Sequence, residues 1–239
     1  MRISKMLIAA ATLSLALPAH TYAQDEGSII VTGSRVDRSD YDRYYDDDQS
    51  AIGLTRKADY FVKPIYVSSD TREAALRIEE LKTMLRQTIS QAPGAGIDLV
   101  AGSYRLQPVS MNNIDDLNIT SGRRPDTSRV LIYARIPVGG GTDSVKEADE
   151  RIQAFVKSIP ATGRSFIDTG TTGLAIDNPD QYRSAVVKAI ADESRRYAGM
   201  FGSEYGVEIR GLDSELYFKQ ASETEVFLFI EHSFVIKPK

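Results

Sequence analysis

Apolar residues recur along this chain with two periods, and each period predicts one kind of secondary structure. A period of two is typical of strands, and a period of three to four is typical of helices. The first pattern, together with shorter apolar stretches, predicts strands at 28–33, 59–67, 97–108, 129–138, 166–176, 206–212, 215–220 and 225–237. The second predicts helices that begin at Asp70 or Thr71, near residue 143, and at Asn178.

The order of these elements favours an α+β fold. Strands joined by single helices and by hairpins are typical of a mixed, largely antiparallel sheet with helices packed on one face. We expect one compact two-layer domain over residues 58–239, preceded by an N-terminal strand and a polar, acidic insertion within residues 24–57.

Both faces of several predicted strands carry large apolar or aromatic residues. A sheet with one wet face should alternate apolar and polar positions. The second faces carry instead Leu131 and Tyr133, Phe227 and Phe229, and Tyr60, Val62 and Tyr66. Two explanations stay open. The sheet is curved and its second face is covered by the long insertions, or that face contacts another subunit. Under the second, Tyr133, Phe227 and Phe229 are candidate interface residues.

The first 23 residues have the three parts of a secretory signal. Arg2 and Lys5 precede an apolar run at 6–17, and Thr21-Tyr22-Ala23 offers a cleavage site. The run is shorter than the roughly 20 residues that a membrane-spanning helix needs. We therefore expect cleavage after Ala23, export to the periplasm with possible outer-membrane association, and at most peripheral membrane contact.

The polar stretch after the first strand is dense in tyrosine and aspartate. Clustered like charges without aliphatic residues argue against a core segment. Aromatic residues beside charges suit recognition, so the segment is a candidate contact site through Tyr41, Tyr44, Tyr45, Asp46, Asp47 and Asp48. The aspartate run lacks the alternate spacing of a calcium-binding EF-hand loop, which favours a solvated loop.

Composition narrows the classes of function. The chain has 29 Lys and Arg against 33 Asp and Glu, and loss of Arg2 and Lys5 with the signal leaves 27 against 33, a net charge of −6. An acidic domain is a poor candidate for nucleic-acid binding. With 0 cysteines, no disulfide, thiol or zinc–thiolate chemistry is available.

Catalytic motifs are incomplete. His20 leaves with the signal, so His232 stands alone inside a hydrophobic strand and completes no Ser–His–Asp or HExxH arrangement. Gly139-Gly140-Gly141 lacks the lysine of a phosphate-binding loop. We expect no catalytic, cofactor-binding or metal-binding residue. A pair of carboxylates that hydrolyses a glycoside stays open as an alternative.

Several strings resemble the SIMPL-domain family of exported bacterial envelope proteins. The family's opening strand resembles 29–34, the strand after its first helix resembles 96–109, and its next strand resembles 128–138. Its third helix resembles 177–202 and its closing strand resembles 225–237. The insertion at 37–57 departs from the family pattern.

The resemblance implies an α+β fold, an envelope location and no enzymatic activity. Some relatives are associated with oxidative-stress tolerance, and some form ring-like or barrel-like oligomers. A non-enzymatic protein that assembles with itself or binds other envelope proteins is therefore expected. A second resemblance, of residues 29–35 to the N-terminal segment of TonB-dependent receptors, leaves open an accessory role in uptake.

Overall fold

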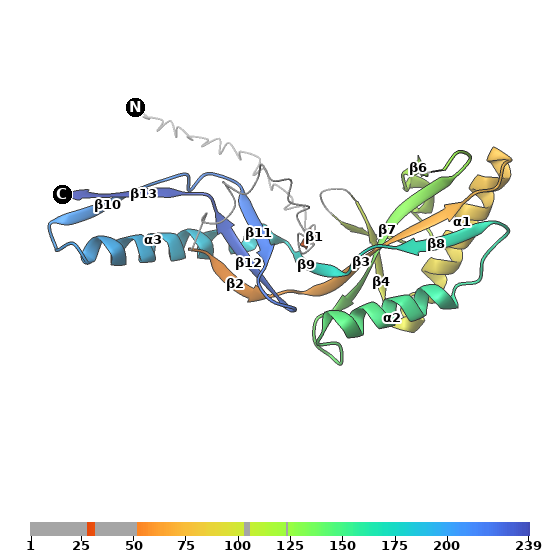
Figure 1. The fold of residues 1–239 in the computed structure, drawn as a ribbon, viewed down its shortest axis with the longest axis horizontal. Coiled ribbons are helices and arrows are strands. Elements are labelled where there is room, and N and C mark those ends of the chain that lie inside the picture. The colour runs from red at the N-terminus through yellow and green to blue at the C-terminus, as the bar shows by residue number, and fades with distance from the viewer. Residues whose placement is uncertain (1–27, 32–51, 103–105, 123) are drawn as a thin grey trace, which may run out of the picture.

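Two ten-residue strands, β3 (Tyr60–Ser69) and β7 (Ser128–Pro137), pair antiparallel over their whole length and form the centre of the fold (Figure 1). The structure is a computed structural model that describes residues 28–31, 52–102, 106–122 and 124–239. The candidate segment Tyr41–Asp48 lies outside these residues.

Three strands and two helices around this pair complete a split β-α-β arrangement. Helix α1 (Ala74–Gln91) connects β3 to β4 (Asp98–Ala101), and helix α2 (Val145–Ser158) connects β7 to β8 (Ser165–Thr169) and β9 (Gly173–Asp177). Strands β8 and β9 pair with one side of β3, and β4 pairs with β7, all antiparallel. This order matches the β-α-β-β-α-β motif of ferredoxin-like folds.

Shorter strands complete this eight-stranded sheet. They are β1 (Ser28–Val31) beside β9, β5 (Gln107–Pro108) beside β4, and β6 (Ile119–Ser121) beside β7. Single 3-10 turns lie at η2 (Pro93–Ala95) and η3 (Ile114–Asp116).

The remaining described strands pack around a third helix. After the 3-10 turn η4 (Pro179–Tyr182), α3 (Arg183–Gly199) covers two small antiparallel sheets. One pairs β10 (Tyr205–Arg210) with β13 (Ser233–Pro238), and the other has the order β11 (Leu216–Gln220), β12 (Glu225–Ile230), β2 (Leu54–Lys57). The predicted α+β class with largely antiparallel strands is confirmed.

Several local predictions are wrong. The predicted strand 97–108 contains two strands, β4 and β5, that pair antiparallel with each other, and the predicted strand 166–176 is divided into β8 and β9. Asn178 precedes the 3-10 turn η4, and the N-cap of α3 is Tyr182.

The predicted strand 225–237 is two strands in different sheets, separated at Glu231 and His232. Residues 54–57, assigned to the polar insertion, form β2. Thr71 does not cap α1, whose N-cap is Glu73 without a side-chain bond, because the Thr71 hydroxyl donates to Glu80 instead.

The buried side chains form two clusters, where the sequence pattern predicts a single core. The first surrounds Ile65 and Ile132 under α1 and α2, and the second surrounds Leu174 and Leu228 against α3. Strand β3 enters both, because Phe61 belongs to the second cluster and Ile65 to the first. Helix α1 and helix α3 lie toward opposite ends of an elongated molecule (Figure 1).

A partly buried ion pair lies where the two clusters meet. Lys63, between Phe61 and Ile65 on the same face of β3, is 3% exposed. Its Nζ donates to the carboxylate of Asp149 on α2, which also accepts from Thr172 and Gln153. Burial alone would raise the pKa of Asp149, but these hydrogen bonds and the Lys63 charge lower it instead. The pair therefore fixes α2 to the centre of the sheet.

We expect Asp149→Asn to lower the free energy of unfolding by about 2 to 3 kcal/mol, because it leaves the Lys63 ammonium buried without an opposite charge. The cost should be smaller than for a fully buried pair, since the Asp149 side chain is 29% exposed. Urea denaturation measures the change. Lys146→Gln, on the exposed side of the same helix, is the control and should have no effect; an equal loss in both variants contradicts the assignment.

Candidate functional site

The face of the eight-stranded sheet that points away from α1 and α2 carries the most distinctive set of polar and aromatic side chains. Strand pairing places three rows of residues side by side on it, because directly paired residues share a face. From β7 through β3 to β8, the rows are Arg129 and Leu131, Ser68 and Tyr66, and Phe166 and Asp168.

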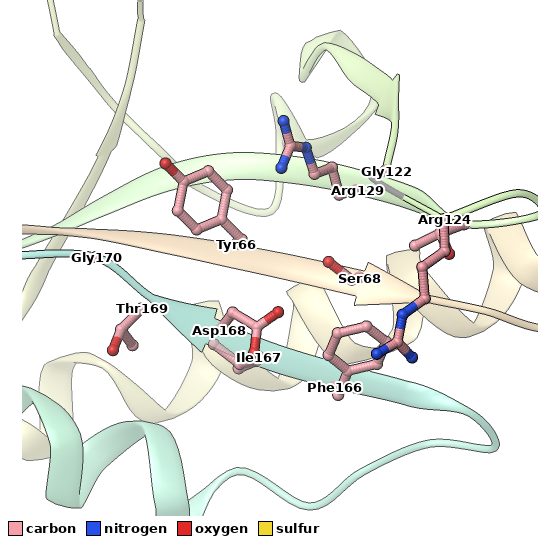
Figure 2. Close-up of a pocket in the computed structure, with 11 residues that line it drawn as sticks. Tyr66, Ser68, Gly122, Arg124, Arg129, Phe166, Ile167, Asp168, Thr169 and Gly170 are labelled. Atoms are coloured by element: carbon pink, nitrogen blue, oxygen red, sulfur yellow. The ribbon is translucent and has the colours of Figure 1, made fainter.

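Two adjoining cavities lie over these rows. One, of about 910 Å³, lies between β8 and the β6–β7 connection (Figure 2). The other, of about 1050 Å³, lies between the sheet and the segment that contains β5 and η3. Both are lined by Tyr66 and Arg129. We call the two together the open-face groove, with Tyr66, Ser68, Arg124, Arg129, Tyr133, Phe166 and Asp168 as its principal side chains.

The charged groups of the groove have no ion-pair partner within the described ranges. The Arg129 guanidinium lies over the Tyr66 ring, 5.3 Å from its centroid. Arg124, Arg129 and Asp168 each lack an oppositely charged atom within 4.0 Å among the described residues. Figure 2 shows these side chains on one face of the sheet, with a helix behind it. The groove thus offers two cations, one anion and aromatic rings to a ligand.

Tyr133 and Tyr60, both on this face, remain protonated donors at neutral pH. Burial raises the pKa of Tyr133, and the nearby Tyr66 raises it further. Burial also raises the pKa of Tyr60, an effect that Arg135, 4.1 Å from the ring centroid, partly offsets. Half-buried tyrosine and arginine side chains are the types that contribute most at protein interfaces.

One end of the groove is fixed by a buried carboxylate. Glu80 on α1 is 8% exposed and accepts hydrogen bonds from the hydroxyls of Ser69 (2.8 Å) and Thr71 (2.6 Å) and from the Arg164 backbone N–H (3.2 Å). Gly163, with φ of 58°, passes so close that a Cβ would lie 2.0 Å from the carboxylate. Glu80 therefore joins the end of β3 to the start of β8.

The Thr71 hydroxyl lowers the pKa of Glu80; burial opposes this, and the Ser69 and Arg164 bonds lower it further. A carboxyl whose pKa is lower in the folded state contributes stability above its ordinary pKa, here 4.5, and that contribution disappears as the pH falls through the folded value.

We therefore expect Glu80→Gln to have a lower free energy of unfolding than the unaltered protein at pH 7. This difference, the stability gap, should narrow as the pH falls below about 4.5. Urea denaturation at pH 7, 5, 4 and 3 measures the gap. Because both proteins keep every other carboxyl, the difference isolates Glu80. A gap that stays constant or widens toward acid pH would count against the pKa direction.

The predicted interface residues lie on two surfaces. Phe227 and Phe229 stack with centroids 5.8 Å apart on the outer face of the three-stranded sheet, and Tyr217 on β11 stacks on Phe229 at 5.7 Å. Tyr133 lies instead in the eight-stranded sheet and lines the open-face groove. Subunit contact through either surface stays a prediction. Tyr217 is not among the interface residues predicted from the sequence, although it alternates with the half-buried positions of β11.

The remaining candidates give no reaction centre. His232 lies between β12 and β13, with its Nδ1 2.8 Å from the Ile230 carbonyl oxygen. A smaller cavity of about 470 Å³ is lined by Asp59 and Asp177, and each lies 3.3 Å from an arginine. In the part of the chain that the structure describes, no group of three or more His, Cys, Asp or Glu side chains is placed to hold a metal ion. The carboxylate-hydrolase alternative gains no support from these contacts.

No protein-family model, curated protein or solved structure matches this chain. Over the described ranges, none of the helices has the length and hydrophobicity needed to cross a bilayer. The resemblance to SIMPL-domain proteins therefore stays a prediction.

Proposed function

We propose that the protein is exported to the bacterial cell envelope and acts there by binding, without catalysis, in the manner of SIMPL-domain proteins. Its partner is another copy of the chain or another envelope protein. The open-face groove is the contact surface.

The observation that carries this proposal is the set of unpaired charges beside half-buried aromatic rings in the groove. Exposed single charges are common, but these three lie around one cavity: Arg129 on β7, Asp168 on β8, and Arg124 in the connection between β6 and β7. The strands hold Arg129 and Asp168 in place, which lowers the entropy lost on binding. By contrast, the carboxylates of the smaller cavity are already paired with arginines.

The groove carries charges of both signs, although the chain as a whole is acidic. A partner attracted by net charge alone would need a single-sign surface. The groove presents both signs within one cavity, which favours a specific partner with its own complementary charges over a uniformly charged polymer.

Photo-crosslinking in the producing bacterium tests the proposal. Benzoylphenylalanine in place of Tyr66 should give a discrete crosslinked species on illumination, because that position lines both cavities. The same residue in place of Lys146, whose side chain is 84% exposed on α2, is the matched control and should give none. Absence of a crosslink at Tyr66, or identical products at both positions, would contradict the proposal.

A further inference from the structure

Strand β8 is an edge of the sheet beside the groove. Among the residues that the structure describes, it pairs only with β3. Edge strands leave backbone N–H and C=O groups without a ladder partner and can accept an additional strand. Its hydrogen-bond register determines which groups those are.

Two backbone bonds fix that register. Asp70 N donates to Arg164 O at 3.4 Å, and Gly170 N donates to Pro64 O at 2.9 Å. In an antiparallel ladder, hydrogen-bonded pairs alternate with pairs whose N–H and C=O point away. The backbone N–H and C=O groups of Phe166 and Asp168 therefore point toward β3. Those of Ile167 and Thr169 point outward, away from the sheet.

The side chains along this edge have a definite character. Phe166, 36% exposed, and the exposed Asp168 lie on the groove face of β8. Residues directly opposite on a neighbouring strand interact best when an aromatic meets an aromatic or β-branched residue and when charges are opposite. The edge therefore favours an aromatic residue opposite Phe166 and a basic residue opposite Asp168.

We propose that β8 binds an extended peptide segment of the partner as an additional antiparallel strand, with a basic side chain opposite Asp168. This inference rests on the proposed function and names the partner chemistry at the same site. Only a polypeptide supplies alternating donors and acceptors to match Ile167 and Thr169, which favours a peptide over a lipid or a glycan.

Distances show which of Asp168 and Arg129 lies closer to an added strand. The added strand would lie about 4.8 Å from β8, but about 14 Å from β7, the strand that carries Arg129. That second separation exceeds the Debye length of about 8 Å at physiological salt. Asp168, on β8 itself, is therefore closer than Arg129 to the bound segment, and it favours a basic residue directly opposite it.

A short peptide tests the pairing. Acetyl-Thr-Lys-Val-Tyr-Thr-amide, aligned antiparallel to β8, places Lys opposite Asp168 and Tyr opposite Phe166. When the peptide is titrated into the protein, the amide NMR signals of Ile167 and Thr169 should shift, and those of α3 should stay in place. N-methylation of Val, whose N–H would point to β8, should weaken binding about tenfold, from the lost hydrogen bond and the added bulk. N-methylation of Tyr, whose N–H would point away, should leave the affinity within about twofold of the unmodified peptide.

Charge exchange provides the matched control. Replacing the peptide Lys by Glu should weaken binding about two- to fivefold, and Asp168→Lys should restore the affinity of the Glu peptide. Asp168 is exposed, so this variant keeps the fold.

Equal losses from both N-methyl groups, or no rescue by Asp168→Lys, would overturn the strand-pairing inference. If no peptide binds while Tyr66 still crosslinks in cells, the inference fails and the proposed binding function stands. If Tyr66 gives no crosslink, the binding function itself fails.

Discussion

The antiparallel pairing of β3 with β7 is the constraint on which the rest of the structure depends. It places alternate residues of a ten-residue ladder on two very different surfaces. One surface is closed by α1 and α2, and its only buried cation, among the described residues, is Lys63, which Asp149 neutralises. The other carries the open-face groove.

Pro64 in the middle of β3 has consequences for the neighbouring strands. Proline has no N–H to donate, so it disfavours an unbroken ladder within a sheet. On that side of β3, the neighbouring segment is divided into two strands, β8 and β9. Between them, Gly170 lies against the Pro64 ring, where a Cβ would approach the proline Cγ to 2.5 Å. The division leaves β8 as a separate edge strand next to the groove, while β9 is covered by β1.

Much of this fold follows from local patterns, but the site does not. Alternation along 59–67 and 129–138 predicts the central strands, and Tyr66 and Tyr133 on their second faces predict that this side of the sheet is unusual. Arg124, Arg129 and Asp168 become neighbours only through pairing of β8, β3 and β7, and each alone looks like an ordinary polar position. The break at His232 is hidden because Val226, Leu228, Phe234 and Ile236 keep one alternation through it. Strand β2, Leu-Thr-Arg-Lys, is too polar and short to be predicted without its partner β12.

Hydroxyl-radical footprinting most directly tests the claim that the open-face groove is a contact surface. It would compare the purified mature protein with the same protein in the envelope of intact producing cells. Tyr66 should be oxidised in the purified protein and protected in cells, while Met200, 65% exposed at the far end of α3, reacts equally in both. Equal oxidation of Tyr66 in the two samples would contradict the account.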